Sequence, residues 1–397
     1  MKVKKNHKLL SSLERRKEHE LLLHHSGATE KRLRTRILRG FRLEHPRFWW
    51  QERKWWQKML CILLATIMLV IGSAYGIARW YIASTAGQDH KFGATFSSDY
   101  AQYFGLDPQE TMQAMISDLN LRHFRLVSYW DSIETSPGQY DFSNLDWQFK
   151  KVEAVRGTIS LAIGLRQPRW PECHMPSWAK NEPKDVWYPQ LKAVMQKVIN
   201  RYKTSPALES YQLENEFFLT AFGECKDFSR DRLVDEFNPV KQLDPEHKVI
   251  ISRSNNAWGV PIGQPQPDEF GISVYKRVWD RTITKRYFEY PFPAWFYAFL
   301  AGTGKIITGK DMIIHELQTE PWPPDQGILE TPITEQNKSL NAQRLKDRIK
   351  YGRATGMTEI DLWGVETWYW RKVKLGDSSL WDAGREAIRQ QQCTSCY

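Results

Sequence analysis

Two glutamates, Glu216 and Glu316, each close an apolar run with the character of a β-strand, YQLENE and IIHE. Two carboxyl groups that face each other across a sugar can cleave a glycosidic bond with retention of configuration. One donates a proton to the leaving oxygen and the other attacks the anomeric carbon. Strands that end at one edge of a barrel bring such distant residues into one site. The pattern therefore predicts that Glu216 and Glu316 form such a catalytic pair.

A third glutamate, Glu320, keeps the choice of nucleophile open. It lies four residues after Glu316 and directly before Pro321. Glu316 follows the apolar run at once, where a strand should end, whereas the residue before a proline is more typical of a loop. We therefore expect Glu316 to be the nucleophile, with Glu320 as the alternative.

Eight short apolar runs alternate with helical stretches from residue 92 onward. The predicted strands are 92–96, 124–128, 158–163, 210–213, 249–252, 270–275, 312–315 and 359–363, and the predicted helices include 108–119, 145–155, 189–202, 293–301 and 339–355. This alternation favours a parallel sheet, and eight units in about 310 residues have the size of a (β/α)8 TIM barrel with insertions. A doubly wound sheet is the alternative, but no glycine-rich nucleotide-binding motif follows any predicted strand.

An apolar segment precedes the predicted barrel. Residues 59–78 carry no charge, and twenty helical residues span a hydrocarbon core of about 30 Å. Residues 1–54 hold 16 Lys and Arg against 6 Asp and Glu. By the positive-inside rule we predict a basic cytoplasmic segment 1–56, a transmembrane signal-anchor helix 57–80, a linker 81–91 and an extracellular catalytic domain 92–397 of a single-pass cell-membrane protein. A cleavable signal peptide is the alternative, although its charged region would be unusually long.

The charge and cysteine content exclude some functions and suggest two disulfides. Outside residues 1–54 the chain has 40 basic and 40 acidic residues, so nucleic-acid binding has no electrostatic support. Cys173 and Cys225 follow neighbouring strands, and Cys393 and Cys396 form a short loop, so both pairs are candidate disulfides. The pair His315-Glu316 lacks the second histidine of a zinc-protease helix. We therefore predict no metal and no cofactor.

A longer motif makes the family resemblance specific. Residues 122–149, RHFRLVSYWDSIETSPGQYDFSNLDWQF, together with YQLENE, resemble clan A glycoside hydrolases, most of all family 42 β-galactosidases and family 5 cellulases. In these TIM-barrel families strand four ends in Asn-Glu and strand seven carries the nucleophile. The resemblance therefore implies Asn215 and the general acid/base Glu216 on strand four, and the nucleophile Glu316 on strand seven. It covers about residues 92–385 in scattered motifs, and Glu214 stands where family 42 often has aspartate.

Three further polar residues are candidates for binding the substrate or the nucleophile. Arg125, on strand two, is expected to donate hydrogen bonds to Glu316. The resemblance implies the same role for Tyr275, at the end of strand six. Asn215 is expected to bind the sugar 2-hydroxyl, a contact that strengthens in the transition state.

Tryptophans that follow strands are candidates for sugar platforms, because an indole ring offers a flat apolar face. Trp363, at the end of strand eight, is expected to stack under the sugar, and Trp130 and Trp322 are expected to line the cleft. The proline-rich loop 166–176, RQPRWPECHMP, offers Arg169, Trp170, Glu172 and His174 as further contacts to sugar hydroxyls, although it could equally serve packing alone.

These features together predict a membrane-anchored retaining β-glycoside hydrolase. Its expected partners are extracellular oligo- or polysaccharides and the lipid bilayer, the latter through residues 57–80. Two alternatives stay open: a transglycosylase that uses the same residues, and a non-catalytic glycan-binding barrel.

Overall fold

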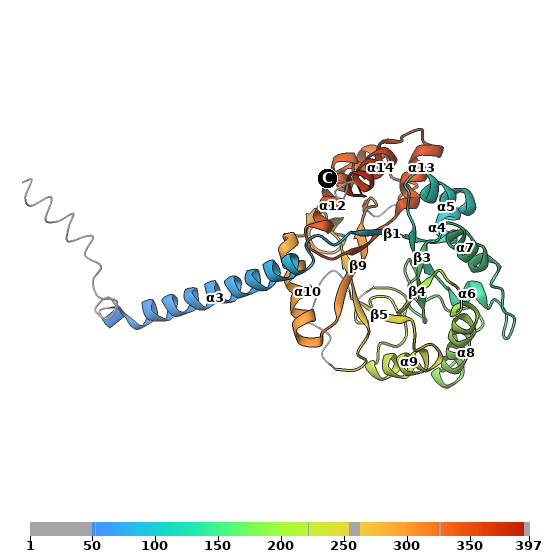
Figure 1. Ribbon diagram of the computed structural model, residues 1–397, viewed down its shortest axis with the longest axis horizontal. Helices are drawn as coiled ribbons and strands as arrows, with labels where there is room; N and C mark the ends of the chain where they lie inside the picture. Colours follow the sequence, from blue (N-terminus) through green and yellow to red (C-terminus); the bar gives the residue numbers. More distant parts are fainter. Residues whose placement is uncertain (1–49, 52, 221, 254–262, 325–326, 393–397) are drawn as a thin grey trace, which may run out of the picture. The chain divides into compact units, whose positions relative to one another are not determined.

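The computed structural model describes residues 50–392 except 52, 221, 254–262 and 325–326. The chain divides into two compact units, Met1–Ile71 and Gly72–Tyr397. The long helix α3, Trp55–Ser84, begins in the first unit and ends in the second (Figure 1).

The second unit is a closed barrel of eight parallel strands in the order β1-β10-β9-β6-β5-β4-β3-β2 (Figure 1). The strands are β1 (Lys91–Phe96), β2 (His123–Val127), β3 (Thr158–Ile163), β4 (Leu208–Leu213), β5 (Lys248–Arg253), β6 (Glu269–Val274), β9 (Asp311–Gln318) and β10 (Glu359–Trp363). All eight predicted strands are confirmed, and with them the TIM-barrel fold. Because parallel strands share one direction, their carboxyl ends form a single face that can carry a site.

Helices surround the barrel: α4 (Ser98–Tyr103), α5 (Pro108–Ser117), α6 (Trp130–Ile133), α7 (Ser143–Ala154), α8 (Lys184–Tyr202), α9 (Arg230–Leu243), α10 (Ala294–Thr308), α11 (Ile333–Ser339), α12 (Ala342–Arg353), α13 (Val365–Lys374) and α14 (Ser379–Gln392). The helix predicted at 339–355 begins later, at Ala342, because the Asn341 side chain caps it by accepting from the Arg344 N–H. A hairpin after β6, with strands β7 (Arg277–Trp279) and β8 (Tyr287–Glu289), was not predicted.

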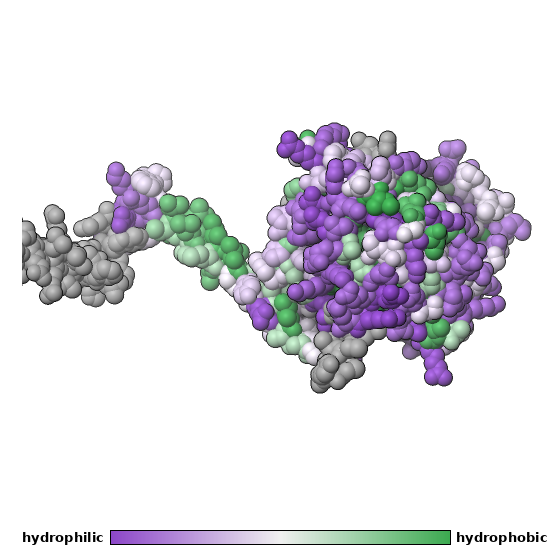
Figure 2. Space-filling model, turned by 90° about the horizontal axis from the view of Figure 1, so that it is seen from above, coloured by the Kyte–Doolittle hydropathy of each residue, from purple (hydrophilic) through white to green (hydrophobic). Residues whose placement is uncertain are grey.

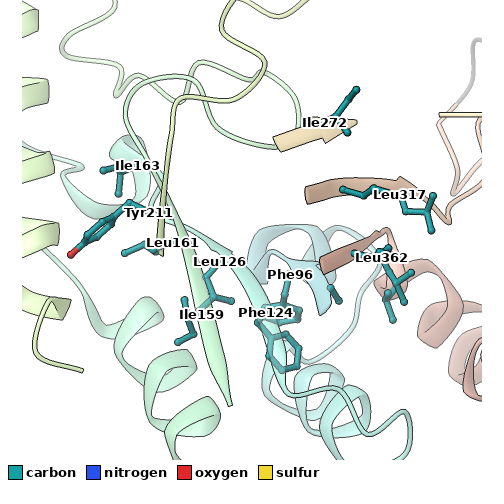
Figure 3. Close-up of a cluster of buried hydrophobic side chains, with 14 of the residues drawn as sticks. Phe96, Phe124, Leu126, Ile159, Leu161, Ile163, Tyr211, Ile272, Leu317 and Leu362 are labelled. Atoms are coloured by element: carbon teal, nitrogen blue, oxygen red, sulfur yellow. The ribbon is translucent and has the colours of Figure 1, made fainter. Parts of the chain in front are cut away.

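The two faces of the barrel strands differ in chemistry. Apolar side chains such as Phe124 and Leu126 of β2 belong to the hydrophobic core (Figure 3). The alternate residues of β2, His123 and Arg125, are buried but polar. Successive side chains of a strand point to opposite faces, and Arg125 bonds to groups on β1, β4 and β9, so its face is the barrel interior. The interior is thus a polar network, and the apolar core lies outside the barrel.

Helix α3 is the one helix among the described residues that is long and apolar enough to cross a membrane. Its surface is largely hydrophobic in Figure 2. The helix continues to Ser84, four residues into the segment that we predicted as a linker, and Ala78 and Tyr81 are buried within the second unit. The turn at Gly87, whose φ is +83°, follows the helix before β1 starts.

One of the two candidate disulfides is present. Cys173 and Cys225 are bonded, with their Cα atoms 5.3 Å apart. The bond connects the loop after β3 to the segment after β4, as their neighbouring positions predicted. Cys61 is a free cysteine within α3. Cys393 and Cys396 lie outside the described residues.

Candidate active site

A cleft of about 380 Å³ opens beside the carboxyl ends of the barrel strands. It is lined by Tyr100, Arg169, Trp170, Glu172, Asn215, Glu216, Leu219, Phe222, Tyr275, Val278, Tyr290, Glu316, Glu320, Trp322 and Trp363. Of the eight predicted site residues, six therefore meet at this cleft, and a seventh, Arg125, lies beneath it in contact with Glu316.

Glu316 lies inside β9, two residues before its end, because the strand is longer than the apolar run that predicted it. The pairing with β6 shifts at this point: Ile272 is opposite Ile314, but Ser273 is opposite Glu316. Such a bulge inserts one extra residue and re-aims the next side chain. The irregularity places the Glu316 carboxylate in the cleft.

Two donors hold the Glu316 carboxylate. The guanidinium of Arg125 donates to its Oε1 at 2.9 Å, and the Tyr275 hydroxyl donates to its Oε2 at 2.8 Å. Burial, followed by the charge of Glu316, raises the pKa of Tyr275 well above its ordinary value, which keeps this hydroxyl a donor. Glu316 is itself only 2% exposed. Hydrogen bonds to an ionised acceptor stabilise its charged form.

Arg125 connects Glu316 to the end of β4. Its Nη2 donates to the Asn215 Oδ1 at 2.8 Å, and its Nε donates to Gln212 at 2.5 Å. A third contact, at 3.2 Å, reaches the Thr95 hydroxyl on β1. The guanidinium is fully buried, so its geometry is fixed by these partners. Arg125 thus holds Asn215, which follows β4, and Glu316, on β9, in fixed positions relative to each other.

Glu216 follows β4 in a left-handed backbone conformation, with φ at +42°. Non-glycine residues adopt this region rarely, and it is typical of functional sites. The Ser252 hydroxyl lies 2.7 Å from the Glu216 backbone nitrogen and accepts its N–H. Burial, followed by the negative charge of Glu316, raises the pKa of Glu216 to about 7.

One hydroxyl joins the two carboxyl groups. Ser273, on β6, forms a short hydrogen bond with Oε1 of Glu216 and lies 3.4 Å from Oε2 of Glu316. These two carboxyl oxygens are therefore less than about 6 Å apart, since both lie within hydrogen-bonding range of a single atom. Ser273 was not predicted from the sequence.

Glu320 is engaged by a different set of partners. Arg169 donates to it at 2.8 Å and the indole N–H of Trp363 donates at 2.6 Å. Tyr100 supplies a third donor at 3.0 Å. The guanidinium of Arg169 is stacked between the rings of Tyr100 and Trp363, at 3.4 and 3.9 Å from their centroids. Glu320 is thus part of the cleft wall, and one face of Trp363 is covered by Arg169.

A further carboxyl group, Glu172, comes from the loop after β3. Its Oε2 accepts from the amide of Asn215 at 3.2 Å. Burial, followed by the charge of Glu216, raises the pKa of Glu172 to about 8. The loop 166–176 therefore contributes to the cleft through Arg169 and Glu172 and is also tied to the barrel by the disulfide at Cys173.

Trp130, which we expected to line the cleft, lies outside it. Trp130 is 1% exposed, and its indole N–H donates to Glu134 at 2.7 Å. The short helix α6 begins at this residue and directs the ring against Trp178 instead of the cleft. Trp322, in contrast, lines the cleft and packs edge-on against Tyr275, with ring centroids 5.3 Å apart.

A second polar cluster occupies the opposite end of the barrel. His123, Glu359 and Asp361 are the group within the described part of the chain whose spacing suits a metal ion. Lys91 forms an ion pair with Glu359, so this carboxylate already has a cationic partner. Although burial opposes it, the charges of Glu359 and Asp361 raise the pKa of His123 to about 10, which makes the imidazole a second cation. We describe this group as an ion-pair network.

No family model matches the sequence, and neither does any curated protein. Similar solved structures include a GH5_18 protein from Bifidobacterium longum subsp. longum in complex with Manβ1-4GlcNAc, at 12% identity, over 77% of this chain and 79% of that chain, with a TM-score of 0.54. A β-galactosidase from Halorubrum lacusprofundi matches at 12% identity, over 76% and 58%, with a TM-score of 0.51. A catalytic mutant of a GH42 β-galactosidase from G. stearothermophilus matches at 12% identity, over 79% and 58%, with a TM-score of 0.51.

This chain spans 58% of the length of each of the two β-galactosidases. At this identity the matches show the fold: the chain has a TIM barrel like those of these three proteins.

Proposed function

We propose that this protein is a membrane-anchored retaining β-glycoside hydrolase that acts on extracellular oligo- or polysaccharides. The observation that carries the proposal is the pair Glu216 and Glu316, whose nearest oxygens are less than about 6 Å apart through Ser273. Retaining enzymes hold their two carboxyl groups about 5–5.5 Å apart, whereas inverting enzymes need about 6.5–9.5 Å to admit a water molecule. The bound on this oxygen pair is compatible with the spacing of a retaining enzyme, which the family resemblance also implies.

The two carboxyl groups divide the chemistry in two steps. In the first, protonated Glu216 gives its proton to the glycosidic oxygen while the Glu316 carboxylate attacks the anomeric carbon, so that the bond to the leaving group breaks and a glycosyl ester forms. In the second, ionised Glu216 takes a proton from water, the water oxygen attacks the same carbon, and the ester bond breaks. A pKa of about 7 on Glu216 suits a group that both donates and accepts a proton near neutral pH.

The surrounding residues support these roles. The donors Arg125 and Tyr275 stabilise the ionised form of Glu316 that attack requires. Asn215, fixed by Arg125, lies beside Glu216 at the cleft and is the residue that we assign to the sugar 2-hydroxyl. Trp322 and Trp363, which line the cleft, supply apolar surface for the sugar rings. These contacts and the fold support a carbohydrate as the substrate.

The location rests on α3 and on the charge of the preceding segment. The helix is long enough to cross a bilayer, and the excess of basic residues before it favours a cytoplasmic N-terminus and an extracellular barrel. The disulfide between Cys173 and Cys225 agrees with an oxidising compartment.

The test is hydrolysis by the full-length protein in detergent, with aryl β-glycosides and β-linked disaccharides that include Manβ1-4GlcNAc. We expect Glu316→Ala to lose turnover and to regain it with added azide, which replaces the missing nucleophile. The released sugar in the intact protein should keep its β-configuration, as followed by proton NMR.

The matched control is Glu320→Ala, because Glu320 is the alternative nucleophile in the same cleft. Under this proposal azide does not rescue that variant. Azide rescue of Glu320→Ala, together with full activity of Glu316→Ala, would reverse the assignment. Products longer than the substrate would identify a transglycosylase. Glycan binding without any turnover would refute the enzyme proposal.

A further inference from the structure

The last turns of α3 belong structurally to the barrel. Ala78 and Tyr81 are buried against the second unit, at 0% and 3% exposure. Tyr75 packs edge-on against Trp295 at the start of α10, with ring centroids 5.7 Å apart. A predicted membrane span that ended in a flexible linker would not bury its final turns in this way. The part of α3 from Tyr75 to Tyr81 is therefore docked on the barrel.

The contact with α10 is close because α10 offers a glycine. A Cβ atom at Gly302 would lie 2.9 Å from Cγ2 of Ile77 and 3.1 Å from Cβ of Tyr81. Small residues let two helices approach closely, and this is a common device between helices at membranes. Figure 1 shows α10 beside the barrel end of α3.

Helix α10 is also unusually apolar for an outer helix of a barrel. Its sequence, AWFYAFLAGTGKIIT, has Lys305 as its single charged residue. The neighbouring helix α12, AQRLKDRIKYGR, has six. Outer helices normally expose a polar face to water. On α10, Ile306 and Ile307 are instead 58% and 59% exposed, so α3 does not cover the whole apolar surface.

We propose that α10 is a second membrane-contacting element, which lies in the head-group region of the bilayer and holds the barrel against it. The proposal rests on the membrane anchoring proposed above. Residues 72–80 belong both to the predicted span and to the unit that contains α10. Trp295 touches Tyr75 of this shared segment, so α10 begins at the boundary of the bilayer. Aromatic residues are enriched at this boundary, and apolar helices lie in its plane.

The test measures how deep single positions lie when the full-length protein is reconstituted in vesicles of phosphatidylcholine and phosphatidylglycerol. A nitroxide is attached through Ile307→Cys, and collisions with lipid-soluble oxygen and with a water-soluble nickel chelate are compared. The background variant carries serine at Cys61, Cys393 and Cys396. We expect oxygen to dominate at position 307.

Two reference positions make the result decisive. Val186, on α8, is 43% exposed and apolar, so Val186→Cys is the matched position away from α10 and should favour the nickel chelate. Leu64, within the predicted span, should report the hydrocarbon core. If position 307 behaves like 186 while 64 reports hydrocarbon, this inference alone is overturned. If 64 reports water, the anchoring fails and the inference falls with it. Hydrolysis of a soluble aryl glycoside by the same samples tests the catalytic proposal independently.

Discussion

The hydroxyl of Ser273 gives the most direct test of how the two carboxyl groups share their charge. Ser273 is fully buried on β6 and forms a short hydrogen bond with Glu216 while it also lies near Glu316. If the hydroxyl donates to Glu216, it stabilises the ionised carboxylate and keeps its pKa lower than burial alone would set it. Ser273→Ala removes this donor and should raise the pKa of Glu216 further.

The size of the expected pKa shift follows from the strength of this hydrogen bond. A hydrogen bond to a charged group contributes about 1.5–3 kcal/mol, and about 1.36 kcal/mol corresponds to one unit of pKa. The proton donor acts only below its pKa, so activity falls as the pH rises past about 7 in the intact protein. In Ser273→Ala this basic limb of kcat/KM should move upward by about one to two pH units.

The assay is kcat/KM against pH, since this ratio reports the ionisation of the free enzyme. A nitrophenyl glycoside with a poor leaving group requires the acid. A dinitrophenolate group leaves without being protonated. The pH profile for a dinitrophenyl glycoside should therefore lack this basic limb in both the intact protein and Ser273→Ala. The matched control is Ser210→Ala. Ser210 is a buried barrel serine that bonds to the Ser160 hydroxyl at 3.0 Å, and its loss should leave the profile unchanged.

Two results would refute the reasoning. A basic limb that moves downward would mean that protonated Glu216 donates to Ser273, so that the hydroxyl stabilises the neutral acid instead. A limb that stays in place in Ser273→Ala, in a protein that still folds, would mean that Glu216 does not set the limb at all.

Three further variants probe other parts of the molecule. Tyr275→Phe removes a donor to the nucleophile and should lower kcat about 10- to 100-fold with little change in the unfolding temperature, and an unchanged kcat would contradict the role given to this hydroxyl. Gly302→Ala should lower the unfolding temperature because its methyl group meets α3, whereas Gly304→Ala, with only a 3.8 Å contact, should raise it slightly through helix propensity; equal shifts would argue against the close approach. The raised pKa of His123 stabilises the folded protein, fully below pH 6.5 and less and less as the pH rises toward about 10. The free energy of unfolding, measured with denaturant, should therefore fall between these two pH values in the intact protein. His123→Gln should not show this fall.

The sequence alone was enough to predict the elements that follow a repeating pattern. The alternation of apolar runs and helical stretches predicted all eight barrel strands, with errors of a few residues at their ends. The largest error bears on the site, because β9 continues past Glu316 to Gln318. An apolar run marks where a strand is buried, but a polar residue inside the barrel can continue the strand without extending the run.

Residues without a pattern could not be assigned before the barrel closed. Ser273 is a small residue within the apolar run FGISVY, and its importance arises from the shifted register between β6 and β9. The partner of Glu320 is Arg169, which comes from a loop 151 positions earlier. The position of Trp130 differs from our expectation for the opposite reason. A tryptophan after a strand matched the expected pattern, but the short helix α6 directs this side chain into the core.

The roles of Glu216 and Glu316 depend on which side chains donate hydrogen bonds to their carboxyl groups. Glu316 accepts from a guanidinium and a phenol, whereas the side-chain partner of Glu216 is a neutral hydroxyl, and no ion pair joins Glu216 to a cation within the described residues. Two carboxyl groups in one cleft whose hydrogen-bond donors differ in charge in this way can serve as acid and nucleophile. The sequence predicted Arg125 and Tyr275 as donors to Glu316, but only the closed barrel shows their distances and the neutral partner of Glu216. The asymmetry of donors is therefore the physical reason to assign the proton to Glu216.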